Sequence, residues 1–164
     1  MRVNILGKVM LCAGLMAGMP VVAAESPGDY GANLREIYFA HQRLLALREA
    51  CDQALPAQAK ASEKAYAAWQ TRHKALLNEL EARLTLMIRR DSKDEKEYMR
   101  NVGKYEGAIL EYRNDKRDEL LAQPRDGMEQ FCGDFRNYLT GSGSDFYKDY
   151  ADELRELRKR KLPK

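Results

Sequence analysis

Residues 58–121 carry two long runs of apolar side chains that recur at steps of three and four residues. This step is the period of an α-helix with one buried face, whereas a half-buried strand would alternate apolar and polar residues. Residues 91–97 separate the two runs and contain no apolar residue. The pattern predicts an elongated antiparallel hairpin of two long helices. The apolar positions are Trp69, Leu76, Leu77, Leu80, Leu84 and Met87 in the first run, and Tyr98, Val102, Tyr105, Ile109, Tyr112 and Leu120 in the second.

The start of the second hairpin helix has a capping signal of its own. Ser92 is followed three residues later by Glu95, which is the capping-box pattern of a helix N-terminus. Before the hairpin, apolar residues at helical spacing predict another helix over residues 33–55. Pro56 then separates this helix from the hairpin, because proline is tolerated in the first turn of a helix but not in its interior.

The region after the hairpin predicts two short helices. Residues 123–127 read Gln-Pro-Arg-Asp-Gly and mark a break, after which a helically spaced apolar run carries Cys132. Residues 140–144 are rich in glycine and serine and predict a flexible joint. Ser144 or Asp145 would then cap the last helix. No segment alternates like a strand, so the predicted fold class is all-α, a hairpin with an N-terminal helix and two short C-terminal helices.

The N-terminus predicts export. Arg2 and Lys8 are the only charged residues before Glu25, and residues 9–24 are small and apolar, with small residues just before Glu25. A basic start, a short apolar middle and a small-residue exit are typical of a secretory signal peptide over residues 1–24. The apolar stretch is short for a transmembrane helix, which needs about 20 residues. An uncleaved N-terminal anchor is the alternative. The predicted location is periplasmic or secreted.

Cleavage would leave residues 25–164 as one nearly neutral domain. The whole chain has 28 basic and 25 acidic residues, and loss of Arg2 and Lys8 leaves 26 basic residues. Nucleic-acid binding would require a clear basic excess on one face. The composition therefore argues against a nucleic-acid partner. The chain is long enough for one hydrophobic core, and after cleavage no integral membrane span is expected.

Two cysteines, Cys51 and Cys132, lie outside the signal segment. In an oxidising compartment such a pair is most simply a structural disulfide. An antiparallel hairpin supports this pairing, because it returns the chain after the second helix to the end at which Cys51 lies. A redox-active pair is the alternative, but the two residues lack the C-x-x-C spacing that tunes a reactive thiol.

His41 and His73 are the two histidines, and both fall at inward-facing positions of neighbouring predicted helices. With a carboxylate such as Glu36 or Glu79 they could hold a metal ion. Neither histidine has ligand spacing to another within one helix, and buried histidines are usually satisfied by hydrogen bonds. We therefore assign no metal ligand and no cofactor, and keep metal binding as the alternative.

Tyr98, Tyr105 and Tyr112 are spaced seven residues apart and form a stripe on one face of the second hairpin helix, beside which Trp69 could pack. Aromatic rings with polar tips are suited to binding a peptide or a sugar, so these four residues are a candidate binding surface. At heptad spacing in a helical bundle the same stripe can be core or core edge.

The sequence predicts no enzyme. It has no G-x-S-x-G, H-E-x-x-H or glycine-rich phosphate-binding motif, and its carboxylates lie on mixed-charge helical faces. An exported hairpin with a long side surface favours binding of another envelope or secreted protein, as an inhibitor or immunity-type module or as a chaperone-like one. The alternative is a periplasmic protein that senses or buffers metal. A surplus apolar stripe could also mark a homodimer.

Overall fold

The computed structural model describes residues 29–162, and all of the regular structure in this range is helical. The all-α prediction is confirmed. The predicted signal peptide, residues 1–24, lies outside the described residues. Within residues 29–162 no helix combines the length and the hydropathy needed to cross a bilayer. The helices are α1 Tyr30–Ala54, α2 Ala59–Arg90, α3 Glu95–Leu121, α4 Arg125–Thr140, α5 Phe146–Asp149 and α6 Ala151–Arg158, with short 3-10 turns at Pro56–Gln58 and Ser142–Ser144.

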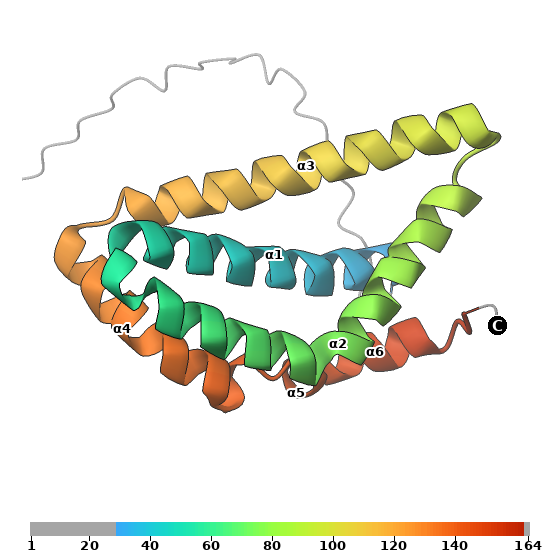
Figure 1. The fold of residues 1–164 in the computed structure, drawn as a ribbon. Coiled ribbons are helices and arrows are strands. Elements are labelled where there is room, and N and C mark those ends of the chain that lie inside the picture. The colour runs from blue at the N-terminus through green and yellow to red at the C-terminus, as the bar shows by residue number, and fades with distance from the viewer. Residues whose placement is uncertain (1–28, 163–164) are drawn as a thin grey trace, which may run out of the picture.

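The predicted hairpin is α2 and α3, which run in opposite directions from the turn that joins them (Figure 1). Its two arms are splayed, and α1 lies between them, so that α3 packs mainly on α1 and much less on α2. Helix α2 bends partway along its length, and its last turns rise toward the start of α3 (Figure 1). The first helix is therefore the centre of the bundle rather than an addition to its side.

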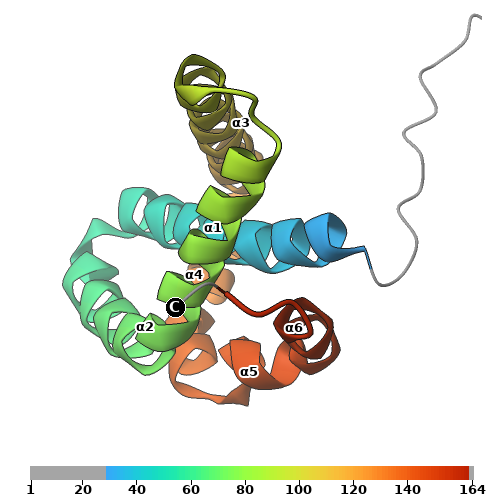
Figure 2. The same cartoon turned by 90° about the vertical axis from the view of Figure 1, so that its right-hand side faces the viewer.

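Helices α4, α5 and α6 close the bundle opposite α3 (Figure 2). α4 packs on α2 and α1, and α6 packs on α1. The last predicted helix is split in two at Tyr150, whose backbone leaves the helical conformation. α3 covers only one side of α1, and none of its residues is fully buried. The core is built from the other helices, with these largest fully buried side chains: Trp69, Phe135, Leu34, Ile37, Leu76, Leu80, Leu139 and Leu157.

The hairpin turn differs from the predicted capping box by two residues. α3 begins at Glu95, and its N-cap is Asp94, whose side chain accepts a hydrogen bond from the backbone N–H of Glu97 at 2.8 Å. Ser92 instead ends the preceding helix, because its hydroxyl donates to the carbonyl oxygen of Ile88 at 2.7 Å. Both residue types can cap a helix, and only the length of the turn decides between them.

The predicted disulfide is confirmed. Cys51 and Cys132 are bonded, and their Cα atoms lie 5.3 Å apart, within the range that a disulfide requires. Cys51 lies in the last turn of α1, and Cys132 lies in the middle of α4. The bond therefore attaches α4 to the central helix of the bundle.

A buried arginine of α2 holds the end of the C-terminal helix α6 by hydrogen bonds. Arg83 of α2 is 3% exposed, and its Nη1 donates to the carbonyl oxygens of Leu157 and Arg160, each at 2.9 Å. Its Nε and Nη2 donate to Glu79 Oε1 at 2.9 and 2.8 Å, and Arg158 Nη2 donates to Glu79 Oε2 at 2.7 Å. A buried arginine needs such partners, and here they are the carbonyl groups that end α6 together with one shared carboxylate.

The glycine- and serine-rich joint before α5 is anchored rather than loose, contrary to the sequence-based expectation. Ser144 is fully buried, its carbonyl oxygen accepts a hydrogen bond from Trp69 Nε1 at 2.7 Å, and its hydroxyl donates to the carbonyl oxygen of Tyr138 at 2.9 Å. These bonds hold the turn against the core and set where α5 begins.

Candidate functional site

The four residues of the sequence-predicted binding surface do not lie on one surface. Trp69 is 0% exposed and belongs to the core, so it cannot contact a partner. Tyr98, Tyr105 and Tyr112 are all partly buried in the structure. The Tyr112 ring lies 4.6 Å from the ring of Phe39 on α1, and Tyr105 packs against the core. The tyrosine stripe is mainly the contact of α3 with α1, because α3 has little else with which to pack.

Trp69 is the centre of an aromatic cluster that joins three helices. Its ring stacks on those of His73 and Tyr66, with centroids 4.4 and 5.8 Å apart, and the ring of Phe146 on α5 meets it edge-on at 5.1 Å. His41 of α1 stacks on the Trp69 ring as well, at 5.7 Å. His73 is thus a side chain of the core, and His41 packs on it from the neighbouring helix while being only partly buried.

Both ring nitrogens of His73 take part in hydrogen bonds. Nδ1 lies 3.0 Å from the carbonyl oxygen of Trp69, which can only accept, and Nε2 accepts from the backbone N–H of Phe146 at 3.3 Å. This pattern requires the proton on Nδ1 and a free lone pair on Nε2. A metal ion at His73 would have to displace the bond that holds the start of α5.

The carboxylates considered as further metal ligands lie apart from the two histidines. Glu79 is held by Arg83 and Arg158, and although burial alone would raise its pKa, these two guanidinium groups lower the pKa below its usual value. Glu36 is exposed on α1. Among residues 29–162, no three or more His, Cys, Asp or Glu side chains are grouped so as to hold a metal ion. Metal binding by His41 and His73 stays a prediction.

His41 is partly buried, and its Nε2 lies 3.1 Å from the hydroxyl of Tyr66. Burial lowers the pKa of His41 from 6.5 to about 4, and the nearby Arg113 lowers it in the same direction. Between these two values the unfolded chain binds a proton at His41 that the folded chain does not. The contribution of His41 to the free energy of unfolding is therefore fully present above pH 6.5. It decreases as the pH falls through this window and is fully lost below about pH 4.

We expect this loss to amount to about 3 kcal/mol, from 1.36 kcal/mol per pKa unit. Urea unfolding of residues 25–164 at pH 4, 5, 6 and 7 would measure it, with His41→Gln as the comparison. Glutamine can still hydrogen-bond Tyr66 but does not titrate, so the variant should lose less stability than the wild type over this range. Equal losses in both proteins would show that His41 does not titrate in the folded state as stated.

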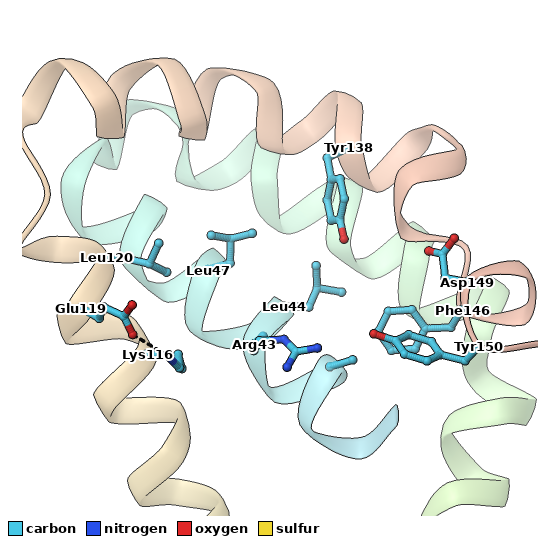
Figure 3. Close-up of a pocket in the computed structure, with 11 residues that line it drawn as sticks. Arg43, Leu44, Leu47, Lys116, Glu119, Leu120, Tyr138, Phe146, Asp149 and Tyr150 are labelled. Atoms are coloured by element: carbon cyan, nitrogen blue, oxygen red, sulfur yellow. Dashed lines mark hydrogen bonds and ion pairs between the residues drawn. The ribbon is translucent and has the colours of Figure 1, made fainter. Parts of the chain in front are cut away.

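A groove beside α1 and α4 is the candidate site for a partner. Its first hollow, of about 280 Å³, lies between α1, the end of α3, α4 and α5 (Figure 3). Its second hollow, of about 590 Å³, continues along α4 and shares Leu47 and Tyr138 with the first. We call the two together the α4 groove. Its lining residues are Ala40, Arg43, Leu44, Leu47, Lys116, Glu119, Leu120, Tyr138, Phe146, Asp149 and Tyr150 in the first hollow, and Gly127, Gln130, Phe131, Asp134 and Phe135 with the two shared residues in the second.

The α4 groove has an apolar floor and an aromatic edge. Leu44 and Leu47 of α1 lie at the floor of the first hollow, and Tyr138 of α4 stands over them with its hydroxyl directed inward (Figure 3). Phe131 and Tyr138 are 41% and 42% exposed although both are large apolar side chains. Rings of this kind at the edge of a hollow are typical anchors of protein–protein contacts.

Charged groups line the mouth of the first hollow. Lys116 and Glu119 form an ion pair with each other. Arg43 donates to the hydroxyl of Tyr112 at 3.3 Å and extends toward the hydroxyl of Tyr150 (Figure 3). Burial alone would lower the pKa of Arg43, but its contacts with these two phenols outweigh burial and raise it. Burial also raises the pKa of Tyr150, so both side chains keep their ordinary charge at neutral pH.

Sequence reasoning missed the α4 groove, although α4 contains a signal for it. Met128, Cys132, Phe135 and Leu139 form the buried stripe of α4. Phe131 and Tyr138 lie seven residues apart and fall beside this stripe rather than on it. Two aromatic residues off the buried face of a short helix could have indicated an exposed contact, but the opposing wall from α1 and α3 is not visible in the sequence.

Comparison of the chain with protein-family models, with curated proteins and with solved structures gives no match.

Proposed function

We propose that this chain is an exported, non-enzymatic helical protein that binds another envelope or secreted protein through the α4 groove. The observation that carries the proposal is the pair of exposed aromatic rings, Phe131 and Tyr138, at the edge of an apolar hollow. Export rests on the signal-peptide pattern of residues 1–24, and the disulfide is consistent with an oxidising compartment.

A defined groove favours an inhibitor or immunity-type module over a chaperone-like one. The two walls of the groove, α1 and α4, are covalently joined by the Cys51–Cys132 bond, so the shape of the groove is set before a partner arrives. Preformed sites of this kind favour one partner of matching shape, because less conformational freedom is lost on binding. A chaperone would instead need a broad, adaptable apolar face.

The direct test is a pull-down from envelope and secreted extracts with the oxidised protein, residues 25–164, read by mass spectrometry. We expect one dominant partner, and we expect Tyr138→Ala to weaken its binding about thirtyfold, which corresponds to about 2 kcal/mol for an aromatic anchor. Met99→Ala is the matched control, because Met99 is 60% exposed on α3 and lines neither hollow of the groove.

Three outcomes are distinct. Equal recovery of the partner by the wild type and by Tyr138→Ala would move the contact away from the α4 groove. A broad set of unfolded proteins in place of one partner would favour the chaperone-like function. An empty pull-down would contradict protein binding.

A further inference from the structure

We infer that the α4 groove recognises a polypeptide segment that carries a carboxylate next to an apolar side chain, with the carboxylate on Arg43 and the apolar side chain in the first hollow. The inference rests on the proposed function and names the chemistry of the partner.

Arg43 is a cation of the groove whose charge can pair with a carboxylate of a partner. Its contacts in the structure are with two neutral phenols, Tyr112 and Tyr150, and among residues 29–162 no carboxylate forms an ion pair with it. Lys116, the other cation at this mouth, is neutralised by Glu119. A guanidinium group offers paired N–H donors that match the two oxygens of a carboxylate, so an acidic side chain or a chain terminus is its natural complement.

The floor beside Arg43 fits an apolar side chain. Leu44 and Leu47 lie one and four residues after Arg43 on α1, and Leu120 and Phe146 complete the same hollow. Its volume of about 280 Å³ is just below that of ligand pockets, which span roughly 300–1,000 Å³. A hollow of this size takes an apolar side chain next to the carboxylate, and the second hollow beyond Tyr138 can take another.

The charges at the mouth favour a polypeptide over an acyl chain. Asp149 lies at the same hollow as Arg43, and no ion pair of Asp149 occurs among the described residues, so the mouth offers both signs of charge. A polypeptide can present an acidic side chain to Arg43 and a backbone N–H or a basic side chain to Asp149. A fatty acid could present its carboxylate to Arg43, but it has no donor for Asp149, which it would leave covered and unpaired.

The test is a selection from a displayed library of random heptapeptides on the immobilised, oxidised protein, residues 25–164. We expect the enriched peptides to share an Asp or Glu within two residues of an aromatic or branched apolar residue. Arg43→Gln should weaken their binding at least tenfold. Arg136→Gln should change it less than twofold, because Arg136 is exposed on α4 and lines neither hollow of the groove.

The pairing of carboxylate and guanidinium can then be isolated. Replacing the acidic residue of the best peptide by its amide should weaken binding to the wild type at least tenfold, and should change binding to Arg43→Gln by less than threefold. Circular dichroism of both arginine variants controls for folding.

Several results would overturn the inference. The first is that the enriched peptides lack an acidic residue. The second is that Arg43→Gln leaves their binding unchanged. The third is that no peptide is enriched while oleate binds in the groove, which would assign an amphiphile as the ligand instead. Each of these leaves the proposed function standing if the pull-down still recovers a protein whose binding depends on Tyr138. If the pull-down recovers no such protein, the proposed function itself fails.

Discussion

Reduction of the Cys51–Cys132 bond is expected to lower the free energy of unfolding by about 4–5 kcal/mol. The two residues are 81 positions apart, so the bond closes a long loop that contains all of α2 and all of α3. In the chain-entropy model a long loop removes many conformations from the unfolded chain, and the gain grows with the logarithm of its length. A domain of this size is stable by roughly 5–15 kcal/mol in total, so the loss is a large share of it.

Urea unfolding of residues 25–164, oxidised and in the presence of a reductant, measures this difference. The double variant Cys51→Ser, Cys132→Ser should behave like the reduced protein. The fluorescence of Trp69, the only tryptophan, reports on the core during the transition. A difference below about 1 kcal/mol would mean that the unfolded chain gains little freedom from reduction, contrary to the model.

Trp69→Ala is expected to cost about 4 kcal/mol, near the upper part of the range for replacing a buried aromatic residue by alanine. Trp69 is fully buried, and its ring contacts side chains of α1 and α5 as well as of its own helix. Its removal would leave a cavity at the junction of these helices. It would also release the carbonyl oxygen of Ser144, which sets the position of the turn before α5.

Trp69→Phe removes the hydrogen bond to Ser144 while keeping much of the buried ring. Phenylalanine keeps an apolar ring in place but cannot donate to Ser144, so we expect a cost of about 1–3 kcal/mol for the unsatisfied carbonyl group and the smaller ring. Leu86→Ala, at a residue 38% exposed on α2, is the control and should change stability by about 0.5 kcal/mol or less. Circular dichroism in urea measures all three variants. A cost for Trp69→Ala no greater than that for Leu86→Ala would contradict the central place of Trp69 in the core.

Much of the architecture could be predicted because its signals are local. The helical period of the apolar residues, the break at Pro56 and the break at residues 123–127 each act within a few residues, and all appear in the structure. The disulfide was predictable as well, since only two of the three cysteines lie outside the predicted signal peptide and two cysteines allow one pairing. Where two local signals compete, as Ser92 and Asp94 do at the start of α3, the sequence indicates the turn but not the capping residue.

The polar side chains of the core could not be placed from sequence. The pattern puts His73 on an inward face, but its partners are the backbone groups of Trp69 and Phe146, and the second of these is 73 residues away. Arg83 gave no signal, because an arginine on a helix usually lies in solvent. Here α6 covers it, and Arg83 donates hydrogen bonds to the carbonyl oxygens at the end of α6. Such partners depend on which helices meet.

In the candidate site, too, local patterns can be read from the sequence, whereas contacts between helices depend on the tertiary structure. From sequence, the tyrosine stripe of α3 suits a binding surface, but its heptad spacing favours packing in a bundle. The position of α1 between α2 and α3 turns the stripe inward. Arg43, Lys116 and Tyr138 come from three helices, and they share a hollow only because α1, α3 and α4 converge there. By itself, the sequence of this protein determined its helices, their order and its disulfide, since these follow from residue spacing. The tertiary structure alone decided which faces remain open, because burial depends on contacts between residues far apart in the chain.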